Sequence, residues 1–208
     1  SVPTADSLFL LILSILALES AHSIRFLYHH FLSGITKRSL NVFYYACSYA
    51  KVDYSNFMNI TARTALKLIP DPLKTHPVFL CVDDTMVSKS GKKFENVSKL
   101  FNHAAHNGSN YLNGHCFVSI MLCVPVLDHD KISYLSVPLG YRMWQKKESE
   151  LELAASMIRQ VMPEFLSKEH VIILCDSWYT KKNLVSIIDE YPNLDLIGNA
   201  RIDSVMYD

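Results

Sequence analysis

Two apolar runs that each end in aspartate constrain the fold of this chain more than any other feature. The first run, VFLCVDD, covers residues 78–84, and the second, VIILCD, covers residues 171–176. A continuous apolar run of this length is typical of a strand that is buried on both faces of a sheet. Both runs are therefore predicted to be central strands, and each places a carboxylate at its end.

The surrounding segments predict the order of elements after residue 78. Apolar patterns indicate further strands at residues 115–126, 132–137 and 194–198, and helices at residues 151–165 and 180–191. Asn107-Gly108 and Asn113-Gly114 are turn signals. The order strand, strand, strand, helix, strand, helix, strand predicts three antiparallel strands to which helical crossovers add parallel ones. We therefore expect a mixed α/β protein with a ribonuclease H-like sheet.

The first part of the chain has a different character. Residues 1–76 are predicted to form a helical region, and residues 77–208 the sheet domain. The apolar run at residues 8–18 is too short for a membrane span, which needs about 20 residues, so a buried helix and no membrane partner are expected. Few basic residues lie in the helical region, and a DNA-binding bundle and a plain packing domain both remain open.

Bulk composition limits the function classes. Half of the 208 residues are hydrophobic, 19% are charged and the formal net charge is zero, so a packed core is expected and overall charge gives no support for a nucleic-acid partner. The five cysteines form no C-x-x-C pair. They are interpreted as free thiols in a reducing compartment, which indicates a cytoplasmic protein.

The aspartates at the strand ends suggest a metal site. Neighbouring strands lie about 4.8 Å apart, so Asp176 and an aspartate of the first run can share one cation, and Mg²⁺ prefers such oxygen ligands. Asp83 and Asp84 point to opposite faces of their strand, and both faces are apolar, so the pattern does not choose between them. Alternatively, each aspartate only forms a turn or caps a helix.

Several motifs together resemble a known family. VDDTMVSKSGKKF, the following NGH, LCDSWYTKKNL and LIGNARIDSVMYD resemble the DDE transposases of bacterial insertion sequences, in the cut-and-paste branch whose first motif reads D-[DE]-T. The resemblance implies that Asp83 and Asp176 are the first two catalytic metal ligands, with Asp84 the less favoured choice. The family's third acidic residue, a glutamate on a later helix, is not found before Asp208, so these residues alone are expected to be inactive.

The resemblance also implies cofactors and partners. They are Mg²⁺ or Mn²⁺, double-stranded DNA in the form of terminal inverted repeats and a target, and a homodimer that assembles on DNA in the bacterial cytoplasm at the nucleoid. The implied activity is metal-dependent strand cleavage and strand transfer. Two alternatives remain: another ribonuclease H-like metal-dependent nuclease, and a non-catalytic DNA-binding transposase relic.

Basic, aromatic and histidine residues supply further candidates. DNA affinity comes largely from phosphate neutralisation, and the candidate phosphate contacts are Lys89, Lys92, Lys93, Arg142, Lys146, Lys147, Lys181, Lys182 and Arg201. Trp178 and Tyr179 are expected in the core, with base stacking as the alternative. The spacing of His103, His106 and His115 matches no recognised zinc ligand set, so zinc is not expected.

Overall fold

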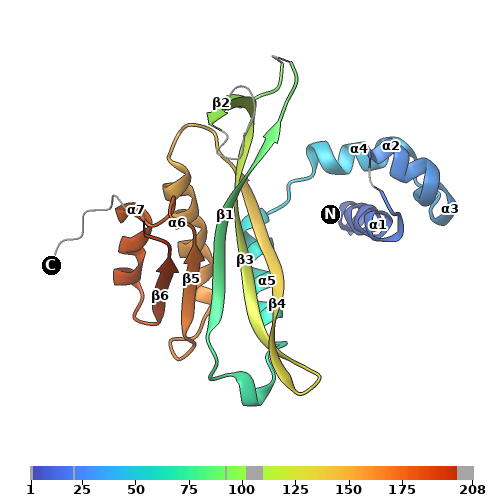
Figure 1. Ribbon diagram of the computed structural model, residues 1–208. Coiled ribbons are helices and arrows are strands. Elements are labelled where there is room, and N and C mark those ends of the chain that lie inside the picture. Colours follow the sequence, from blue (N-terminus) through green and yellow to red (C-terminus); the bar gives the residue numbers. More distant parts are fainter. Residues whose placement is uncertain (1, 21, 92, 102–109, 201–208) are drawn as a thin grey trace. The chain divides into compact units, whose positions relative to one another are not determined.

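The computed structural model describes every residue except 1, 21, 92, 102–109 and 201–208. The chain divides into two compact units, residues 1–53 and residues 54–208 (Figure 1). The predicted helical region, 1–76, therefore spans the first unit and the beginning of the second. The reason is that the helix at residues 54–66 buries Met58, Ala62 and Ala65 in the core of the larger unit.

The smaller unit is helical throughout. Its elements are α1 (Val2–Ala17), α2 (Ile24–Leu27), the π-helical turn η1 (Tyr28–Leu32), α3 (Ser33–Ile35) and α4 (Leu40–Tyr49). Ser23 caps α2 by accepting a hydrogen bond from the Phe26 amide, as is usual for an N-cap serine. The unit packs around a small core of Leu11, Leu27, Leu32 and Phe43.

Helix α1 contains the apolar run that was predicted to be a buried helix. The helix forms, but only one of its sides is buried: Leu11 is 5% exposed, whereas Phe9 is 62% and Leu16 is 79% exposed. The prediction of burial was thus right for one face of the helix only. Within the part of the chain that the structure describes, no helix has the length and hydrophobicity needed to cross a bilayer.

The larger unit is built on a six-stranded mixed sheet. Its strands are β1 (Val78–Ser88), β2 (Ser98–Phe101), β3 (Tyr111–Asp128), β4 (Lys131–Met143), β5 (Val171–Cys175) and β6 (Leu194–Gly198). β1, β3 and β4 are antiparallel neighbours, and β5 and β6 follow β1 in parallel. The spatial order β4-β3-β1-β5-β6 is the ribonuclease H-like order that the sequence predicts, so this fold class is confirmed.

The helices of the larger unit are α5 (Tyr54–Leu66), α6 (Glu150–Val161) and α7 (Lys182–Val185). Helix α6 begins with a capping box, in which the Ser149 hydroxyl and the Glu152 carboxylate each accept a hydrogen bond from the other's amide. The short 3-10 turns η3 (Met162–Glu164) and η4 (Ser186–Glu190) continue α6 and α7. Pro163 therefore ends α6 before residue 165, earlier than predicted.

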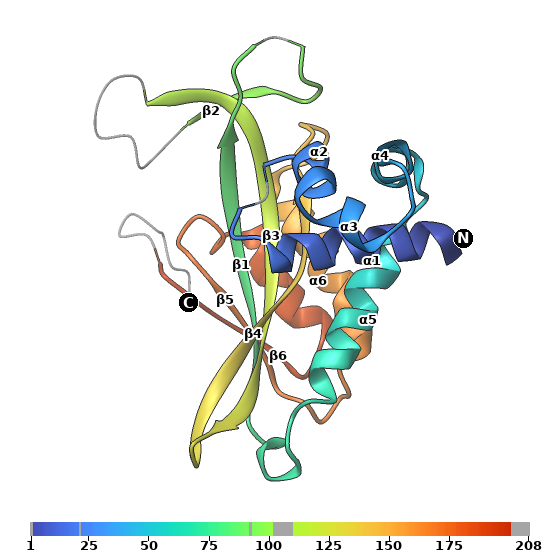
Figure 2. The same ribbon diagram turned by 90° about the vertical axis from the view of Figure 1, so that its right-hand side faces the viewer.

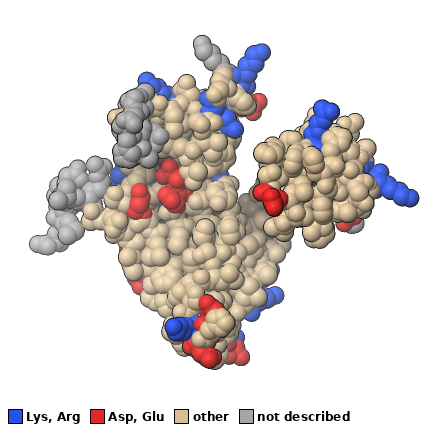
Figure 3. Space-filling view, turned by 45° about the vertical axis from the view of Figure 1, so that its right-hand side comes forward, with Lys and Arg blue, Asp and Glu red and all other residues tan. Residues whose placement is uncertain are grey.

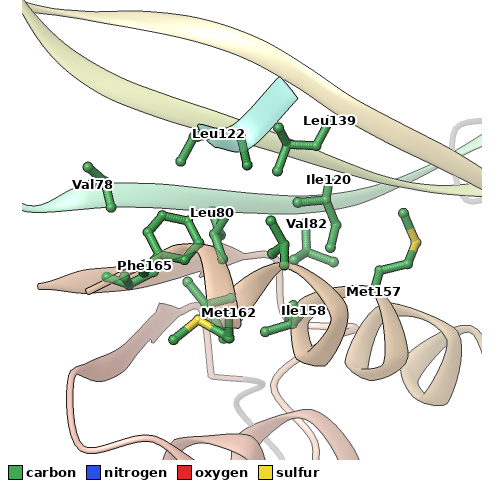
Figure 4. Packing of buried hydrophobic residues seen from close by; sticks show 14 of the residues in the cluster. Val78, Leu80, Val82, Ile120, Leu122, Leu139, Met157, Ile158, Met162 and Phe165 are labelled. Carbon is green, nitrogen blue, oxygen red and sulfur yellow. The ribbon is translucent and has the colours of Figure 1, made fainter. Parts of the chain in front are cut away.

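The core lies between the sheet and these helices. Figure 4 shows Leu80, Val82 and Ile120 of the sheet facing Ile158 and Met162. Figure 2 shows α5 and α6 on one side of the sheet, and along β1 the residues on that side are buried while those between them are half-buried. The parallel strands are thus covered by helices on one face within the described residues.

The region between β1 and β3 differs from the prediction. Asn113-Gly114 was predicted to be a turn, but it lies within β3, paired with β2 and close to the end of β1. A β-carbon on Gly114 would lie 2.3 Å from the Val87 carbonyl oxygen, so glycine here serves close backbone approach rather than a turn. Asn107-Gly108 lies outside the described residues.

Candidate functional site

The two aspartate-ended runs are adjacent in the sheet. β1 and β5 are parallel neighbours, with Val82 opposite Cys175. Asp84 follows Val82 by two residues and Asp176 follows Cys175 by one, so both lie at the same end of neighbouring strands. This is the juxtaposition that the sequence predicts for a shared cation.

A pocket of about 480 Å³ opens at this end of the sheet. Its lining combines acidic, aromatic and apolar side chains with one lysine: Asp84, Met86, Lys99, Leu100, Phe101, Trp144, Glu150, Asp176, Ser177 and Trp178. The pocket therefore brings Asp84 and Asp176 together with a third carboxylate, that of Glu150.

Asp83 lies on the other face of β1. It is exposed, it sits opposite Ser119 in the strand register, and its Oδ1 accepts a hydrogen bond from the Asp84 amide. The alternation of side chains along a strand explains this, because Asp84 continues the buried series Val78, Leu80 and Val82. Asp84, the choice that the family resemblance favours less, is thus the aspartate that faces Asp176.

The Asp84 carboxylate is held by two donors. The Tyr179 hydroxyl donates to Oδ1 at 3.3 Å, and the Cys116 thiol donates to Oδ2 at 3.7 Å. Burial raises the pKa of Asp84, the charges of Asp83 and Asp176 raise it further, and the two hydrogen bonds partly oppose this. A half-buried carboxylate near like charges is stabilised by a cation or a proton, so this position suits a metal ligand.

Asp176 is exposed and also shapes its own turn. Its Oδ1 accepts hydrogen bonds from the amides of Trp178 at 3.0 Å and Tyr179 at 3.4 Å. The turn-forming role weighed from the sequence therefore occurs. It engages one carboxylate oxygen and fixes the direction of the side chain, which is compatible with a ligand on the other oxygen.

Glu150 is the acidic residue of the pocket that sequence reasoning missed. In the sequence it stands only as an acidic residue at the start of a helix, where the helix dipole favours negative charge. Burial and then the charge of Asp84 raise the pKa of Glu150, while hydrogen bonds to Trp178 and Cys116 lower it. The predicted strand order could have indicated this position. Because β1 and β4 are both antiparallel to β3, they run in the same direction, and the helix after β4 begins at the same end of the sheet as Asp84.

The donor set of the pocket is one of hard oxygen ligands. In the described ranges no group of three or more His, Cys, Asp or Glu side chains is spaced to hold a metal ion directly. Two carboxylates can still hold Mg²⁺, which is commonly bound by one or two carboxylates while water and substrate phosphate complete its coordination. The residues present therefore fit Mg²⁺ or Mn²⁺.

The predicted phosphate contacts are dispersed. Lys181 lies beside the pocket, with its Nζ 3.5 Å from the centroid of the Trp178 ring. Arg142 instead donates to Ser156 and Gln160 on α6 and is thereby held in a packing role. Lys89, Lys93, Lys146, Lys147 and Lys182 lie at the surface or partly buried, and Lys92 and Arg201 lie outside the described residues.

Charge on the surface is nevertheless uneven. On the face shown in Figure 3, Lys and Arg side chains gather at the end of the larger unit that carries β2, and Asp and Glu side chains lie next to them. Lys99, which the pocket includes, belongs to β2. A basic surface thus adjoins an acidic one although the net charge of the chain is zero.

The structure places three of the aromatic and histidine candidates. Tyr179 is fully buried, whereas Trp178 is 38% exposed and lines the pocket, so core packing holds for the tyrosine but not for the tryptophan. The His115 ring is hydrogen-bonded through Nε2 to the Glu95 carbonyl at 2.7 Å. His103 and His106 lie outside the described residues.

Comparison with known proteins adds little to this geometry. No protein-family model matches the chain, and no curated protein matches it. Solved structures with some likeness are the Mos1 strand transfer complex, with a TM-score of 0.30, 11% identity and 96% of this chain covered, and the Mos1 transposase paired-end complex with the left transposon end, at 0.31, 12% and 93%.

The chain spans 58% of the length of each of those two chains. TM-scores this low carry no weight for function. The class of the protein is set instead by its own strand order and pocket: a ribonuclease H-like mixed sheet with carboxylates at the ends of its two central parallel strands.

Proposed function

We propose that these residues form part of a metal-dependent enzyme that cleaves DNA phosphodiester bonds, with Asp84 and Asp176 as the pair of residues that holds the metal. The observation that carries the proposal is the shared pocket. Two carboxylates from the ends of adjacent parallel strands line it, and the charge of Asp176 raises the pKa of Asp84. A divalent ion held there supplies Lewis-acid activation of water and stabilises the leaving oxygen.

The residues around the pair have separable roles in this proposal. Tyr179 and Cys116 orient Asp84 through their hydrogen bonds, and the turn at residues 176–179 orients Asp176. Hydrogen bonds to a metal-binding side chain commonly fix its direction and tune its basicity. Lys99 and Lys181, at the pocket rim, are placed to contact a phosphate of the substrate.

The finer assignment is a transposase. It is supported by the resemblance of the motifs around residues 83–93 and 174–184 to DDE transposases. We propose accordingly that the whole enzyme binds the terminal inverted repeats of a mobile element as a homodimer, uses Mg²⁺ or Mn²⁺, and joins the freed 3′ ends to target DNA. Residues 1–76 are proposed to contribute to DNA binding.

Neutral variants of the three aspartates test the proposal, and Asp83→Asn is the matched control because Asp83 is adjacent in sequence but on the other face of β1. The full-length protein that contains these residues is purified and incubated with supercoiled plasmid in Mn²⁺, and nicked product is measured over time. We expect Asp84→Asn and Asp176→Asn to lose nicking at least about 100-fold, because each removes a carboxylate that would hold the metal, with DNA retention unchanged. Asp83→Asn should retain activity.

Loss in Asp83→Asn with retention in Asp84→Asn would refute the assignment of the pair. A DNA-binding relic is the second candidate, favoured by the lack of a three-residue metal group in the described ranges. It predicts DNA retention by the wild-type protein with no nicking in any divalent metal.

A further inference from the structure

Two thiols meet on the face of the sheet that the helices of the larger unit leave uncovered in the described structure. Cys81 on β1 and Cys123 on β3 are half-buried, and their Sγ atoms lie 3.8 Å apart. The strand register explains the approach: Leu80 pairs with Leu122, so Cys81 and Cys123 occupy diagonal positions on either side of that pair. Diagonal neighbours of an antiparallel pair usually lie about 7–8 Å apart, and here the two thiols turn toward each other so that their sulfur atoms come into contact.

The surroundings disfavour the reactive thiolate form of Cys81. Cys123 Sγ also lies 3.4 Å from the Ser136 hydroxyl oxygen, so the pair sits in a partly polar surface patch. Burial, and secondly the neighbouring Cys123, raise the pKa of Cys81 to about 11. Both cysteines are half-buried. Oxidation needs their sulfur atoms to close from 3.8 Å to the roughly 2.05 Å of a disulfide, and the two strands to shift, because a disulfide spans Cα atoms no more than about 7 Å apart.

The other cysteines lack these features. Cys47 is exposed and belongs to the other compact unit, and Cys116 is buried and donates to Asp84. Cys175 lies on β5 opposite Val82, which is on the helix-covered face. Within the described residues, the diagonal pair is therefore the one place where two thiols are in contact.

We propose that Cys81 and Cys123 are a redox modification site that closes to a disulfide when the protein meets a two-electron thiol oxidant such as an azodicarboxamide. One thiolate adds to the N=N bond of the oxidant, and the second attacks the sulfur of that adduct. The S–S bond forms as the S–N bond breaks. The two thiols lose two electrons and two protons in total, and the oxidant leaves as the hydrazine.

The cross-link joins β1 to β3 three residues before Asp84. It therefore ties together the two strands that carry Asp84 and its thiol donor Cys116. This inference does not depend on the proposed nuclease activity, because it follows from the position of two side chains on the opposite face. Thioredoxin with its reductant should reverse the modification.

The test is a map of the cysteines after oxidation. Native wild-type protein is treated with diamide, the remaining thiols are blocked with N-ethylmaleimide under denaturing conditions, and the digest is analysed by mass spectrometry. We expect one major linked peptide pair, Cys81 to Cys123, which disappears after reduction with dithiothreitol. The Cys47→Ser variant is the matched control and should give the same linked pair.

The result that overturns the proposal is a map in which Cys81 and Cys123 both carry maleimide after oxidation, or are linked mainly to other cysteines. The wild-type map alone gives this answer, so it does not rely on a variant that fails to fold. The variants Cys81→Ser and Cys123→Ser should each abolish the linked pair and leave the partner thiol open to maleimide. In either variant, a new disulfide that joins the remaining thiol to another cysteine as readily as the wild-type pair forms would also contradict the assignment.

Discussion

Removal of the Tyr179 hydroxyl is the sharpest perturbation of the proposed metal site that leaves both carboxylates in place. Tyr179 is fully buried, and its hydroxyl donates to Asp84 Oδ1 at 3.3 Å. This hydrogen bond lowers the pKa of Asp84, opposing burial and the nearby aspartates. Tyr179→Phe keeps the ring and removes the donor, so the folded protein should hold the ionised, metal-binding form of Asp84 less well.

The size of the effect follows from the geometry. A hydrogen bond to a charged group contributes about 1.5–3 kcal/mol, and the 3.3 Å distance is long for an oxygen donor, which favours the lower end. Since about 1.4 kcal/mol corresponds to a tenfold change in affinity, Tyr179→Phe should weaken Mn²⁺ binding about tenfold. That value lies at the low end of the roughly 10–100-fold effects seen when an outer-shell partner of a metal ligand is removed.

The assay is a Mn²⁺ titration followed by electron paramagnetic resonance of the free ion. Tyr134→Phe is the matched control, because the Tyr134 hydroxyl donates to the Pro77 carbonyl at 3.2 Å and makes no contact with Asp84. That control should bind Mn²⁺ like the wild type. A Tyr179→Phe protein that is folded and binds Mn²⁺ within about twofold of the wild type would refute the role given to this hydroxyl.

Three further predictions concern stability in urea without divalent metal. The pKa of Asp84 is raised by burial and by the neighbouring aspartates, so its contribution to stability is full below the unfolded pKa of about 3.9 and is lost as pH rises through the folded pKa. At pH 7 the Asp84→Asn variant should therefore unfold at a higher urea concentration than the wild type. An equal or lower urea midpoint of unfolding would contradict this. Gly114→Ala should cost about 1–3 kcal/mol, because the new β-carbon meets the Val87 carbonyl at 2.3 Å; a neutral effect would show that the strands can separate. Leu122→Ala, at a fully buried position, should cost about 2–5 kcal/mol, whereas Leu127→Ala, 53% exposed, should stay within about 0.5 kcal/mol.

Most of the fold could be predicted from the sequence because the apolar runs are local signals. Strands β5 and β6 coincide with the predicted residues 171–175 and 194–198. β1 continues six residues past Val82, through exposed and half-buried positions that pair with β3. The short strand β2 was missed, because its four residues lie in a polar region and acquire strand structure only through pairing with β3.

The site was less predictable because it depends on which face each side chain takes. Both faces of β1 are apolar near its start, so alternation alone left Asp83 and Asp84 open, and the family motif favoured Asp83. The decisive fact is tertiary: α6 covers the face that carries Val82 and Asp84. Glu150 was missed for a related reason, since its place in the pocket depends on β4 ending at the same side of the sheet as β1.

The most direct test of the central claim is a crystal structure of the protein soaked in Mn²⁺, with anomalous scattering used to locate the ion. The account predicts a peak in the pocket within coordination distance of the carboxylates of Asp84 and Asp176, roughly 2.0–2.2 Å as for small hard cations. A peak at Asp83 on the outer face of β1, or no peak near Asp84 and Asp176 at millimolar Mn²⁺, would contradict it.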